Sequence, residues 1–193
     1  KLYSIGASGS SMLPYHSENG GVTWVRYSAL PDNKQYNCIA ANLSGQYVAV
    51  GSWTESQTIY ISSDYGATFN TISLPTGSFY AGFVPWNIDM SEDGSVIAVL
   101  VKATQTTQVG QFTVCTSTNY GASFSTSSSF ISTNASEGSV SVSGNGVYIR
   151  WYAWNTSNNS WGYNSSNSGS SWSYNGLSTN QLFKDVSMSY NGQ

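Results

Sequence analysis

The sequence predicts an all-β fold built from about four copies of one short unit. Apolar residues alternate with polar ones over short runs, and two different glycine-containing motifs recur along the chain at nearly the same interval. Alternation with a period of two is typical of half-buried β-strands, whereas no stretch keeps the 3.6-residue apolar period of an amphipathic helix. A recurrence every 45 to 55 residues indicates a structural repeat, so the repeat decides the architecture.

The composition is typical of an extracellular β-protein. Of 193 residues, 39% are apolar and 15% aromatic, enough for a real core, while only 8% are charged, against roughly a quarter in an average soluble domain. The net charge is −3 and the six basic residues do not cluster, which argues against nucleic acid as a partner. No apolar run approaches the roughly 20 residues needed to cross a bilayer, so we expect no membrane span in this chain.

The two motifs mark the same positions in each unit. The first reads SSDYGATF at 62–69 and STNYGASF at 117–124, with looser copies SENGGVTW at 17–24 and SSNSGSSW at 165–172. The second reads ANLSGQYVAV at 41–50, MSEDGSVIAV at 90–99, VSGNGVYIRW at 142–151 and MSYNGQ at 188–193. Because two independent markers share one period, the chain is a tandem repeat rather than a chance similarity.

Each unit is predicted to hold four strands. The first strand ends at the second motif, whose glycine tolerates positive φ and turns the chain into a hairpin with the second strand. A third strand, such as 57–62 or 111–117, leads into the first motif, and a fourth begins at that motif's last aromatic residue. Four antiparallel strands in 45 to 55 residues form the blade of a β-propeller. We therefore expect a single propeller region over 1–193, with repeats at about 1–37 (partial), 38–86, 87–138, 139–185 and 186–193 (the start of a next blade).

The first motif resembles the Asp-box, or BNR repeat, whose pattern is Ser-x-Asp-x-Gly-x-Thr-Trp. We interpret it as structural, because the Asp-position oxygen can accept backbone N–H groups across the turn and the glycine supplies a left-handed conformation. Three of the four copies carry Asn in place of Asp, which keeps the acceptor but removes the charge that catalysis or metal binding would need. We expect no catalytic residue, metal or cofactor in these turns. Their structural positions are Ser17, Asn19, Gly21, Trp24, Ser62, Asp64, Gly66, Phe69, Ser117, Asn119, Gly121, Phe124, Ser165, Asn167, Gly169 and Trp172.

The resemblance implies several functions. Asp-box propellers occur in sialidases, in xyloglucan-type glycoside hydrolases and in sortilin-like receptors, and similar tandem repeats occur in large surface proteins of microbial eukaryotes and their viruses. A sialidase clamps its substrate with three arginines, and this chain has only Arg26 and Arg150. We therefore expect a non-catalytic module on a cell or virion surface or in the extracellular space, with other protein subunits or surface glycans as partners. The alternative is a portion of a glycoside hydrolase whose catalytic residues lie mostly elsewhere.

Glycoside hydrolysis would need two carboxyl groups about 5 to 10 Å apart. Asp89 is the most interesting candidate, because it shares its strand position with small neutral residues of the other repeats and could line a central channel. Glu92 and Asp93 fall in a predicted hairpin turn and Glu18 in an Asp-box-like loop, where a solvated turn residue is the simpler interpretation. The carboxylates considered are Glu18, Glu55, Asp89, Glu92, Asp93, Glu137 and Asp185.

The remaining candidates are aromatic, sulfur-containing or glycosylated. Tyr152 and Trp161, among Asn and Ser residues, could form a flat platform for a sugar, or could instead pack within the blade. Cys38 and Cys115 fall on different strand positions, so a disulfide between them is the less favoured alternative, and His16 is interpreted as a loop residue. Five sequons make candidate N-glycosylation sites at Asn42, Asn134, Asn155, Asn158 and Asn164.

The last and first residues of the chain correspond to consecutive positions within one repeat. The stretch VSMSYNGQ at the end reads as a first strand with its turn, and KLYSIGAS at the start aligns with the second strand YVAVGS. Either the last strand pairs with the first and closes a four-bladed ring, or the chain belongs to a larger propeller or a head-to-tail assembly. Four blades is the low end of the known range, so we favour the second alternative.

Overall fold

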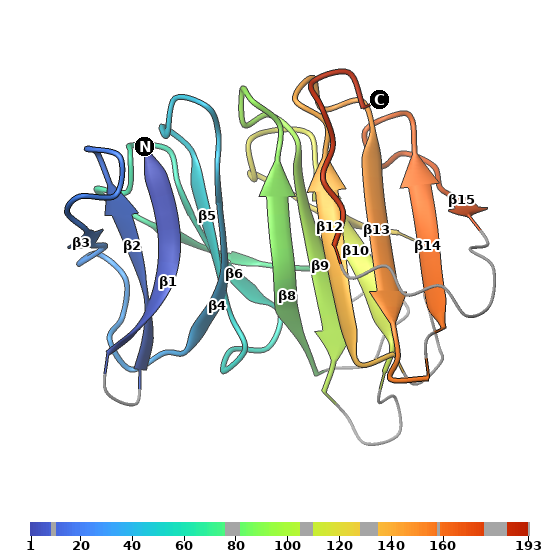
Figure 1. Cartoon of the computed structure of the whole chain (residues 1–193), viewed down its shortest axis with the longest axis horizontal. Helices are drawn as coiled ribbons and strands as arrows, with labels where there is room; N and C mark the ends of the chain where they lie inside the picture. The colour runs from blue at the N-terminus through green and yellow to red at the C-terminus, as the bar shows by residue number, and fades with distance from the viewer. Residues whose placement is uncertain are drawn as a thin grey trace.

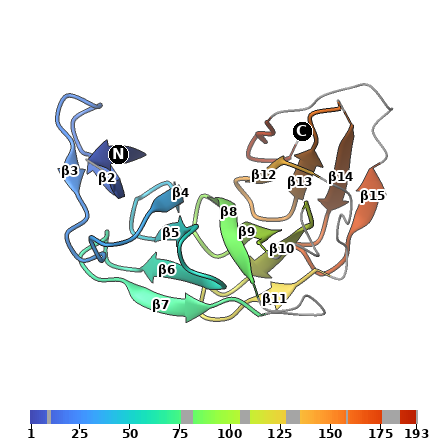
Figure 2. The same ribbon diagram turned by 90° about the horizontal axis from the view of Figure 1, so that it is seen from below.

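The chain folds into four antiparallel sheets that stand side by side as the blades of a β-propeller (Figures 1 and 2). The computed structural model describes residues 1–8, 11–75, 82–104, 110–127, 135–157, 159–175 and 185–192. Seen from below, the blades follow an open arc with the two ends of the chain at its two ends (Figure 2). No helix long and apolar enough to span a membrane occurs among the described residues.

Each blade is a short meander whose strands pair in chain order. Blades two, three and four have four strands, and blade one has three within the described residues. Blade one contains β1 (Leu2–Ser8), β2 (Ser11–Ser17) and β3 (Val25–Arg26); blade two contains β4 (Tyr36–Ala41), β5 (Val48–Ser52), β6 (Thr58–Ser62) and β7 (Asn70–Ser73); blade three contains β8 (Phe83–Met90), β9 (Ile97–Ala103), β10 (Phe112–Ser117) and β11 (Ser125–Thr126); blade four contains β12 (Glu137–Val142), β13 (Ile149–Trp154), β14 (Ser160–Ser165) and β15 (Ser173–Asn175).

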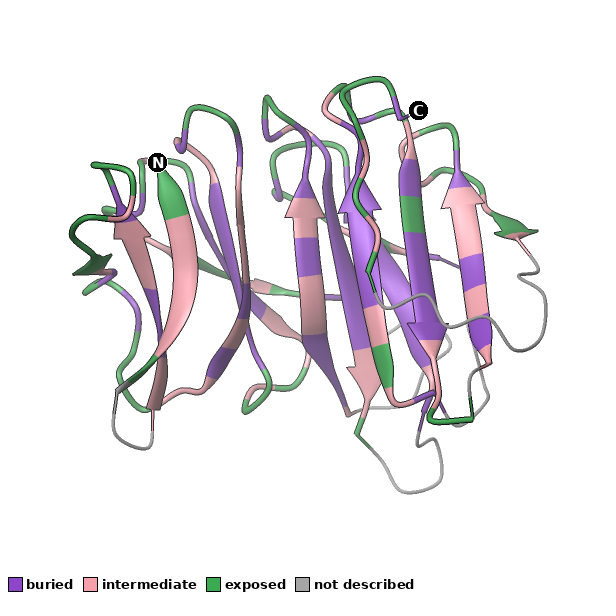
Figure 3. Cartoon of the chain, in the orientation of Figure 1, coloured by how far each residue is buried: buried purple, intermediate pink, exposed green. Residues whose placement is uncertain are grey.

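The hydrophobic core lies between the blades and not within any one of them. Successive side chains of a strand point to opposite faces of its sheet, so each blade sends one set of residues toward the preceding blade and the other toward the following blade. In β5, for example, Val48 and Val50 pack toward blade one, while Ala49 packs toward blade three. Both faces are therefore buried in the middle strands, which appear purple in Figure 3.

Three apolar clusters join the four blades. Leu13, Tyr36 and Val48 belong to the cluster between blades one and two. Ile59, Ile97 and Val99 belong to the one between blades two and three, and Leu100, Phe112 and Trp151 to the one between blades three and four. Burying one large apolar side chain fully stabilises the fold by about 1.5–3 kcal/mol relative to leaving it exposed. Because these side chains are buried between blades, each blade depends on its neighbours for most of its stability.

The two outer faces of the arc have no blade packed on them among the described residues. Blade one turns Leu2 and Trp24 outward, and these are 46% and 43% exposed. On blade four, Arg150 is exposed at the position that holds the buried Ala49 and Ala98 in blades two and three. The faces that stack inside the arc and the faces at its ends thus differ strongly in burial.

The last described segment, residues 185–192, lies beside blade four and forms no ladder with β1. Asn145 donates its backbone N–H to the carbonyl of Tyr190 at 3.0 Å, whereas β1 lies at the other end of the arc (Figure 1). The alternative of a four-bladed ring closed within one chain is therefore not the arrangement seen. Residues 186–190 were expected to form a strand, but among the described residues they belong to none of the four sheets.

Candidate functional site

The four turns that resemble Asp-boxes have one hydrogen-bond pattern. Ser62 is buried, and its hydroxyl accepts the N–H of Gly66 at 2.8 Å and donates to Asp64 Oδ1 at 2.8 Å. The same oxygen of Asp64 accepts the N–H of Thr68 at 2.9 Å. In each turn, one serine hydroxyl and one carboxylate or amide oxygen thus accept the backbone N–H groups. The equivalent bonds to Ser17 and Asn19, Ser117 and Asn119, and Ser165 and Asn167 are all 2.8–3.0 Å long.

Asp64 differs from its three Asn counterparts in the direction of one bond. The Thr68 hydroxyl donates to Asp64 Oδ2 at 2.6 Å, whereas the amide nitrogen of Asn19 donates to the Thr23 hydroxyl at 2.9 Å. The hydroxyl and the backbone N–H of Thr68 lower the pKa of Asp64 to about 2. All its oxygens serve the turn, so the carboxylate is engaged structurally.

The glycine of each turn has a left-handed backbone, with φ of +81° to +91°. The aromatic residue closing two of the turns lies back over this glycine, since Trp24 and Trp172 donate their indole N–H to the carbonyls of Gly21 and Gly169 at 3.1 and 3.0 Å. Phe69 and Phe124 close the other two turns and pack on the apolar clusters, as Trp172 also does.

The inner strands are joined from blade to blade by polar side chains. Asp89 of β8 is half-buried, and its Oδ2 accepts the N–H of Val142 at 2.7 Å and the hydroxyl of Ser141 at 3.2 Å, both from β12. Its Oδ1 accepts the N–H of Met90 at 2.9 Å. Burial raises the pKa of Asp89, and these donors oppose that shift. Asp89 therefore links blades three and four, and none of its hydrogen-bond partners is a carboxyl group.

Asn37, Asn87 and Asp185 make similar links. Asn37 donates its amide N–H to the carbonyl of Pro85 at 2.9 Å, and Asn87 Oδ1 accepts the N–H of Val140 at 2.8 Å. Asp185 Oδ1 accepts the hydroxyl of Ser139 at 2.8 Å. Inner-strand polar residues thus hold neighbouring blades together around the arc.

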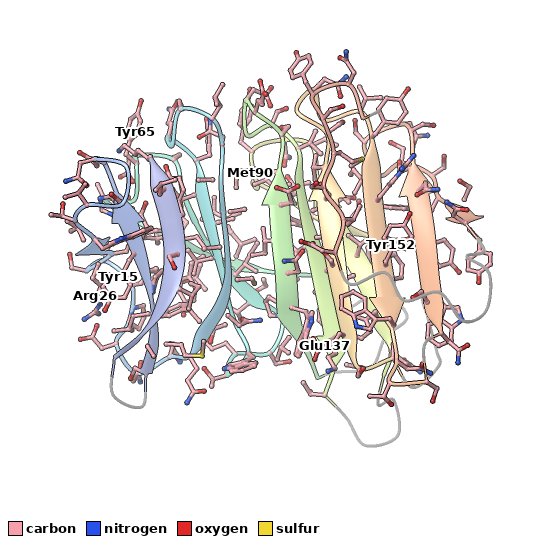
Figure 4. The ribbon with its side chains drawn as sticks, viewed as in Figure 1. Tyr15, Arg26, Tyr65, Met90, Glu137 and Tyr152 are labelled. Carbon is pink, nitrogen blue, oxygen red and sulfur yellow. The ribbon has the colours of Figure 1, made fainter. Side chains whose placement is uncertain are left out.

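The other acidic residues lie in turns or ion pairs. Asp93 accepts hydrogen bonds from Ser91 and Ser95 within its hairpin turn, next to Glu92. Glu18 pairs with Lys1 at 2.8 Å, and Glu55 pairs with Lys34 at 2.6 Å and accepts the hydroxyl of Tyr60. Glu137 is exposed at the lower end of β12 (Figure 4). Among the described residues no group of three His, Cys, Asp or Glu side chains could hold a metal ion.

Tyr152 and Trp161 do not form the candidate sugar platform, and both pack on blade four as the alternative interpretation had it. Tyr152 is paired with Gly162, and Trp161 with Ala153, so the two aromatic side chains lie on opposite faces of blade four. Trp161 packs against the cluster shared with blade three, while Tyr152 covers Gly162 on the other face and is only 8% exposed. Figure 4 shows where Tyr152 lies on β13. They cannot contact one sugar together.

The sequons differ in access. Asn42 is buried, and its amide donates to Ser44 and to the carbonyl of Asp93 while its Oδ1 accepts the N–H of Tyr47, so the folded turn has no space for a glycan there. This corrects the expectation for Asn42. Asn155 and Asn164 are half-buried, and Asn134 and Asn158 lie outside the described residues.

Both cysteines are free thiols in the cluster between blades two and three. Burial raises the pKa of each to about 12, which keeps them in the unreactive thiol form. His16 lies in β2 and not in a loop, where its ring stacks on Tyr27 at 4.6 Å between centroids. The loop assignment for His16 is therefore wrong.

A cluster that the sequence reasoning missed lies at the end of the blades opposite the Asp-box-like turns. Trp53, 41% exposed, has its ring centroid 6.4 Å from that of Trp86, and its indole donates to Gln35 at 3.1 Å. Lys102 lies over the other ring, with Nζ 3.9 Å from the Trp86 centroid, and donates to the carbonyl of Ser136 at 2.6 Å. We call Trp53, Trp86 and Lys102 the tryptophan–lysine cluster.

Comparison with known proteins gives the fold alone. No family model matches the chain, and no curated protein matches it. Among solved structures, it is similar to the GH74 xyloglucanase from Xanthomonas campestris (TM-score 0.57, 14% identity, 83% of this chain and 26% of that one). It is also similar to YCF48 bound to D1 peptide (TM-score 0.57, 12% identity, 94% and 52%) and to the sialidase of Trypanosoma rangeli (TM-score 0.59, 14% identity, 84% and 32%).

These neighbours are all β-propellers or contain one, and they include BNR-type sialidases. The chain spans about half of the YCF48 chain and less of the two enzymes. Identities of 12–14% support a shared architecture and say nothing of a shared activity.

Proposed function

We propose that this propeller is a non-catalytic module that works through surface contact, on a cell or virion surface or in the extracellular space. The observation that carries this proposal is the use of Asp89, the most promising carboxylate of the sequence. Its two oxygens accept three donors from β8 and β12, so its carboxylate is occupied in joining two blades. A hydrolase would need a second carboxyl group beside it, and its partners are a hydroxyl and backbone amides.

The contact surface that we assign is the tryptophan–lysine cluster, and the partner class is a glycan. Sugars bind to aromatic faces that have hydrogen-bonding groups at their edge. Trp53 offers an exposed ring and Gln35 an amide next to it, while the charge of Lys102 is partly desolvated and its pKa is lowered by burial. This cluster replaces Tyr152 and Trp161 as the candidate glycan contact.

A glycan array with the purified chain tests this assignment. We expect binding to a subset of glycans that falls at least tenfold in affinity for Trp53→Ala, because the sugar loses its stacking surface. Tyr174→Ala is the matched control, since Tyr174 is an exposed aromatic residue on β15 of blade four, whereas the cluster lies on blades two and three, and this variant should bind as the parent chain does. An array without bound glycans, or equal loss in both variants, would contradict the glycan assignment.

The alternative function is a portion of a glycoside hydrolase. It is favoured by the likeness to a xyloglucanase and a sialidase and by the raised pKa of Asp89, which is what a general acid requires. The non-catalytic proposal predicts no turnover of xyloglucan oligosaccharides or sialosides. Turnover that Asp89→Asn abolishes while the circular dichroism spectrum stays unchanged would establish the hydrolase instead.

A further inference from the structure

One repeat position at the end of the second strand is aromatic in two blades and basic in the blade between them. Trp53, Lys102 and Trp154 each follow the turn glycine of their blade by eight residues. Strand pairing agrees with this alignment, because Lys102 lies opposite Val84 of its inner strand as Trp154 lies opposite Glu137. Of blades two, three and four, only blade three has a charged residue there. The tryptophan–lysine cluster thus contains a cation where the repeat otherwise has an aromatic ring.

Lys102 is a half-buried cation that has no ion pair with a carboxylate among the described residues. Glu137 of β12 acts on its charge, but Glu137 is exposed, and burial lowers the pKa of Lys102 more than Glu137 raises it. The other described basic residues either pair with an acidic side chain or are exposed to water. The paired residues are Lys1, Arg26 and Lys34, and the exposed one is Arg150.

The ammonium group of Lys102 keeps donor capacity for a ligand. Lysine has three N–H donors, and one of them is used by the carbonyl of Ser136, at 2.6 Å from Nζ. The ring of Trp86 lies below Nζ, with its centroid 3.9 Å away, in a cation–π contact. Both partners are electrically neutral, so they hold the ammonium in place without neutralising it. An anionic group would offset the desolvation of this charge and accept the remaining donors.

The backbone of β8 fixes the place of Trp86. The pairing of β8 with β9 shifts between Pro85 and Asn87, so Trp86 lies in a β-bulge. Asn37 of blade two donates its amide N–H groups to the carbonyls of Pro85 at 2.9 Å and of Trp86 at 3.2 Å. The bulge is thus held from the preceding blade. A ring fixed in this way loses little freedom when a ligand binds beside it.

We propose that the glycan bound by the tryptophan–lysine cluster is acidic, with a carboxylate or sulfate group that pairs with Lys102 while a sugar ring stacks on Trp53. This inference rests on the glycan contact proposed above and adds the chemical class of the ligand. Trp53 and Lys102 both approach Trp86, with the Trp53 centroid 6.4 Å and Lys102 Nζ 3.9 Å from its ring centroid, so one short glycan reaches both. Lysine binds as a point charge, so either anion suits it.

Titration calorimetry with two matched pairs of sugars measures the preference for charge. Oligogalacturonate and its methyl ester differ in the charge of the carboxyl group, and sulfated and unsulfated cello-oligosaccharides differ in sulfate. We expect the parent chain to bind the charged member of at least one pair about tenfold more tightly, and that pair identifies the anion.

The glycan contact and the acidic class can fail separately. Equal affinity within both pairs, lost in Trp53→Ala, would overturn the acidic class and leave the glycan contact standing. Binding on the glycan array without binding to either charged sugar would do the same. No binding to these sugars or on the array would overturn both.

Lys102→Met tests the role of the ammonium group. Met keeps an apolar stem over Trp86 and removes the charge, so the preference for the charged sugar should disappear while the affinity for its neutral counterpart stays. Arg150→Met is the matched control, because it removes one positive charge from an exposed position on β13 of blade four and should keep the preference. Equal loss in the two variants would indicate an effect of net charge and overturn the pairing with Lys102.

The salt dependence of binding needs no variant. The affinity of the parent chain for the charged sugar should fall as the sodium chloride concentration rises, whereas the affinity for its neutral counterpart should stay constant, because salt screens the ion pair. A preference that does not change with salt would overturn the role of the charge, even if Lys102→Met failed to fold.

Discussion

The turn of blade one and the turn of blade two have the same local structure and very different surroundings. Gly21 and Gly66 have φ of +91° and +86°, and both donate their N–H to a buried serine. A Cβ on Gly66 would overlap the ring of Tyr27, whereas a Cβ on Gly21 would touch only Leu2 at 3.4 Å and Trp24 at 3.9 Å. The positive φ favours glycine in both turns. Only Gly66 also has no space for a side chain, because blade one packs against its turn.

The same contrast holds for the rest of the arc. Gly121 is crowded by Ile61 of blade two and Gly169 by Thr116 of blade three, so every interior turn contacts the preceding blade. Repeat proteins divide their stability into the unit itself and its interface with the next unit. A residue that recurs at the same position of every blade can therefore contribute a different amount to the free energy of unfolding in each blade.

The largest expected effect comes from Gly66→Val, with Gly21→Val as its matched control. Both add a branched side chain at positive φ, which costs about 1–3 kcal/mol. Gly66→Val adds overpacking against Tyr27, worth about another 1–3 kcal/mol. Urea denaturation should show the free energy of unfolding falling clearly more for Gly66→Val. Equal losses would mean that contact with the preceding blade does not decide how much the turn glycine contributes to stability.

A smaller effect is expected from breaking the link between blades three and four. Asp89→Ala removes the acceptor for two donors of β12 and should cost about 1–3 kcal/mol. Asp89→Asn keeps one acceptor and should cost less. A loss in Asp89→Ala no greater than that of an exposed carboxylate such as Glu137→Ala would show that the link is not needed.

The pH dependence of Asp89 has a definite sign. Burial raises its pKa in the folded state, so the folded protein holds this proton more tightly than the unfolded chain does. Its contribution to stability is greatest below about pH 3.8 and is lost as the pH rises through the raised pKa. Compared with Asp89→Asn, the parent chain should therefore lose stability as the pH rises above about 3.8. The opposite slope would contradict the role of burial.

The smallest effect is expected for Asp64→Asn, which makes the second turn like the other three. The change should barely move the denaturation midpoint at neutral pH, because Asn19, Asn119 and Asn167 hold the same turn. The pKa of Asp64 is lowered to about 2, so its contribution is present above about pH 3.8 and is lost as the pH falls toward 2. Acid titration of the two proteins should diverge only in that window. A loss at neutral pH as large as that of Gly66→Val would refute this ranking.

The sequence predicted most accurately those features, such as tight turns and strand starts, that local backbone preferences determine. The two motifs placed the turns, because glycines at positive φ and serines with bound N–H groups act within a few residues of one another. Fourth strands were expected from Phe69 and Phe124 and are observed one residue later, at β7 and β11. The alternation of apolar and polar residues likewise indicated short strands such as the inner strand β8.

Prediction from the sequence was weakest where two strands meet. Tyr152 and Trp161 looked like neighbours along the chain, but the pairing of Tyr152 with Gly162 puts them on opposite faces. Trp53 and Trp86 come together from different blades, so no spacing along the chain could have shown the cluster they form with Lys102.

The sequence by itself determined the all-β class, the period of the blades, the place of each tight turn and the shared phase of the two ends. These are properties of short segments, whose backbone preferences and alternation act over a few residues. Only the tertiary structure decided that Asp89 bridges two blades, that Asn42 is buried, that Gly66 is crowded and Gly21 is not, and that residues 185–192 lie far from β1. The physical reason is that in a stack of blades burial, pKa and packing all come from the neighbouring blade, which is about 50 residues away in the chain.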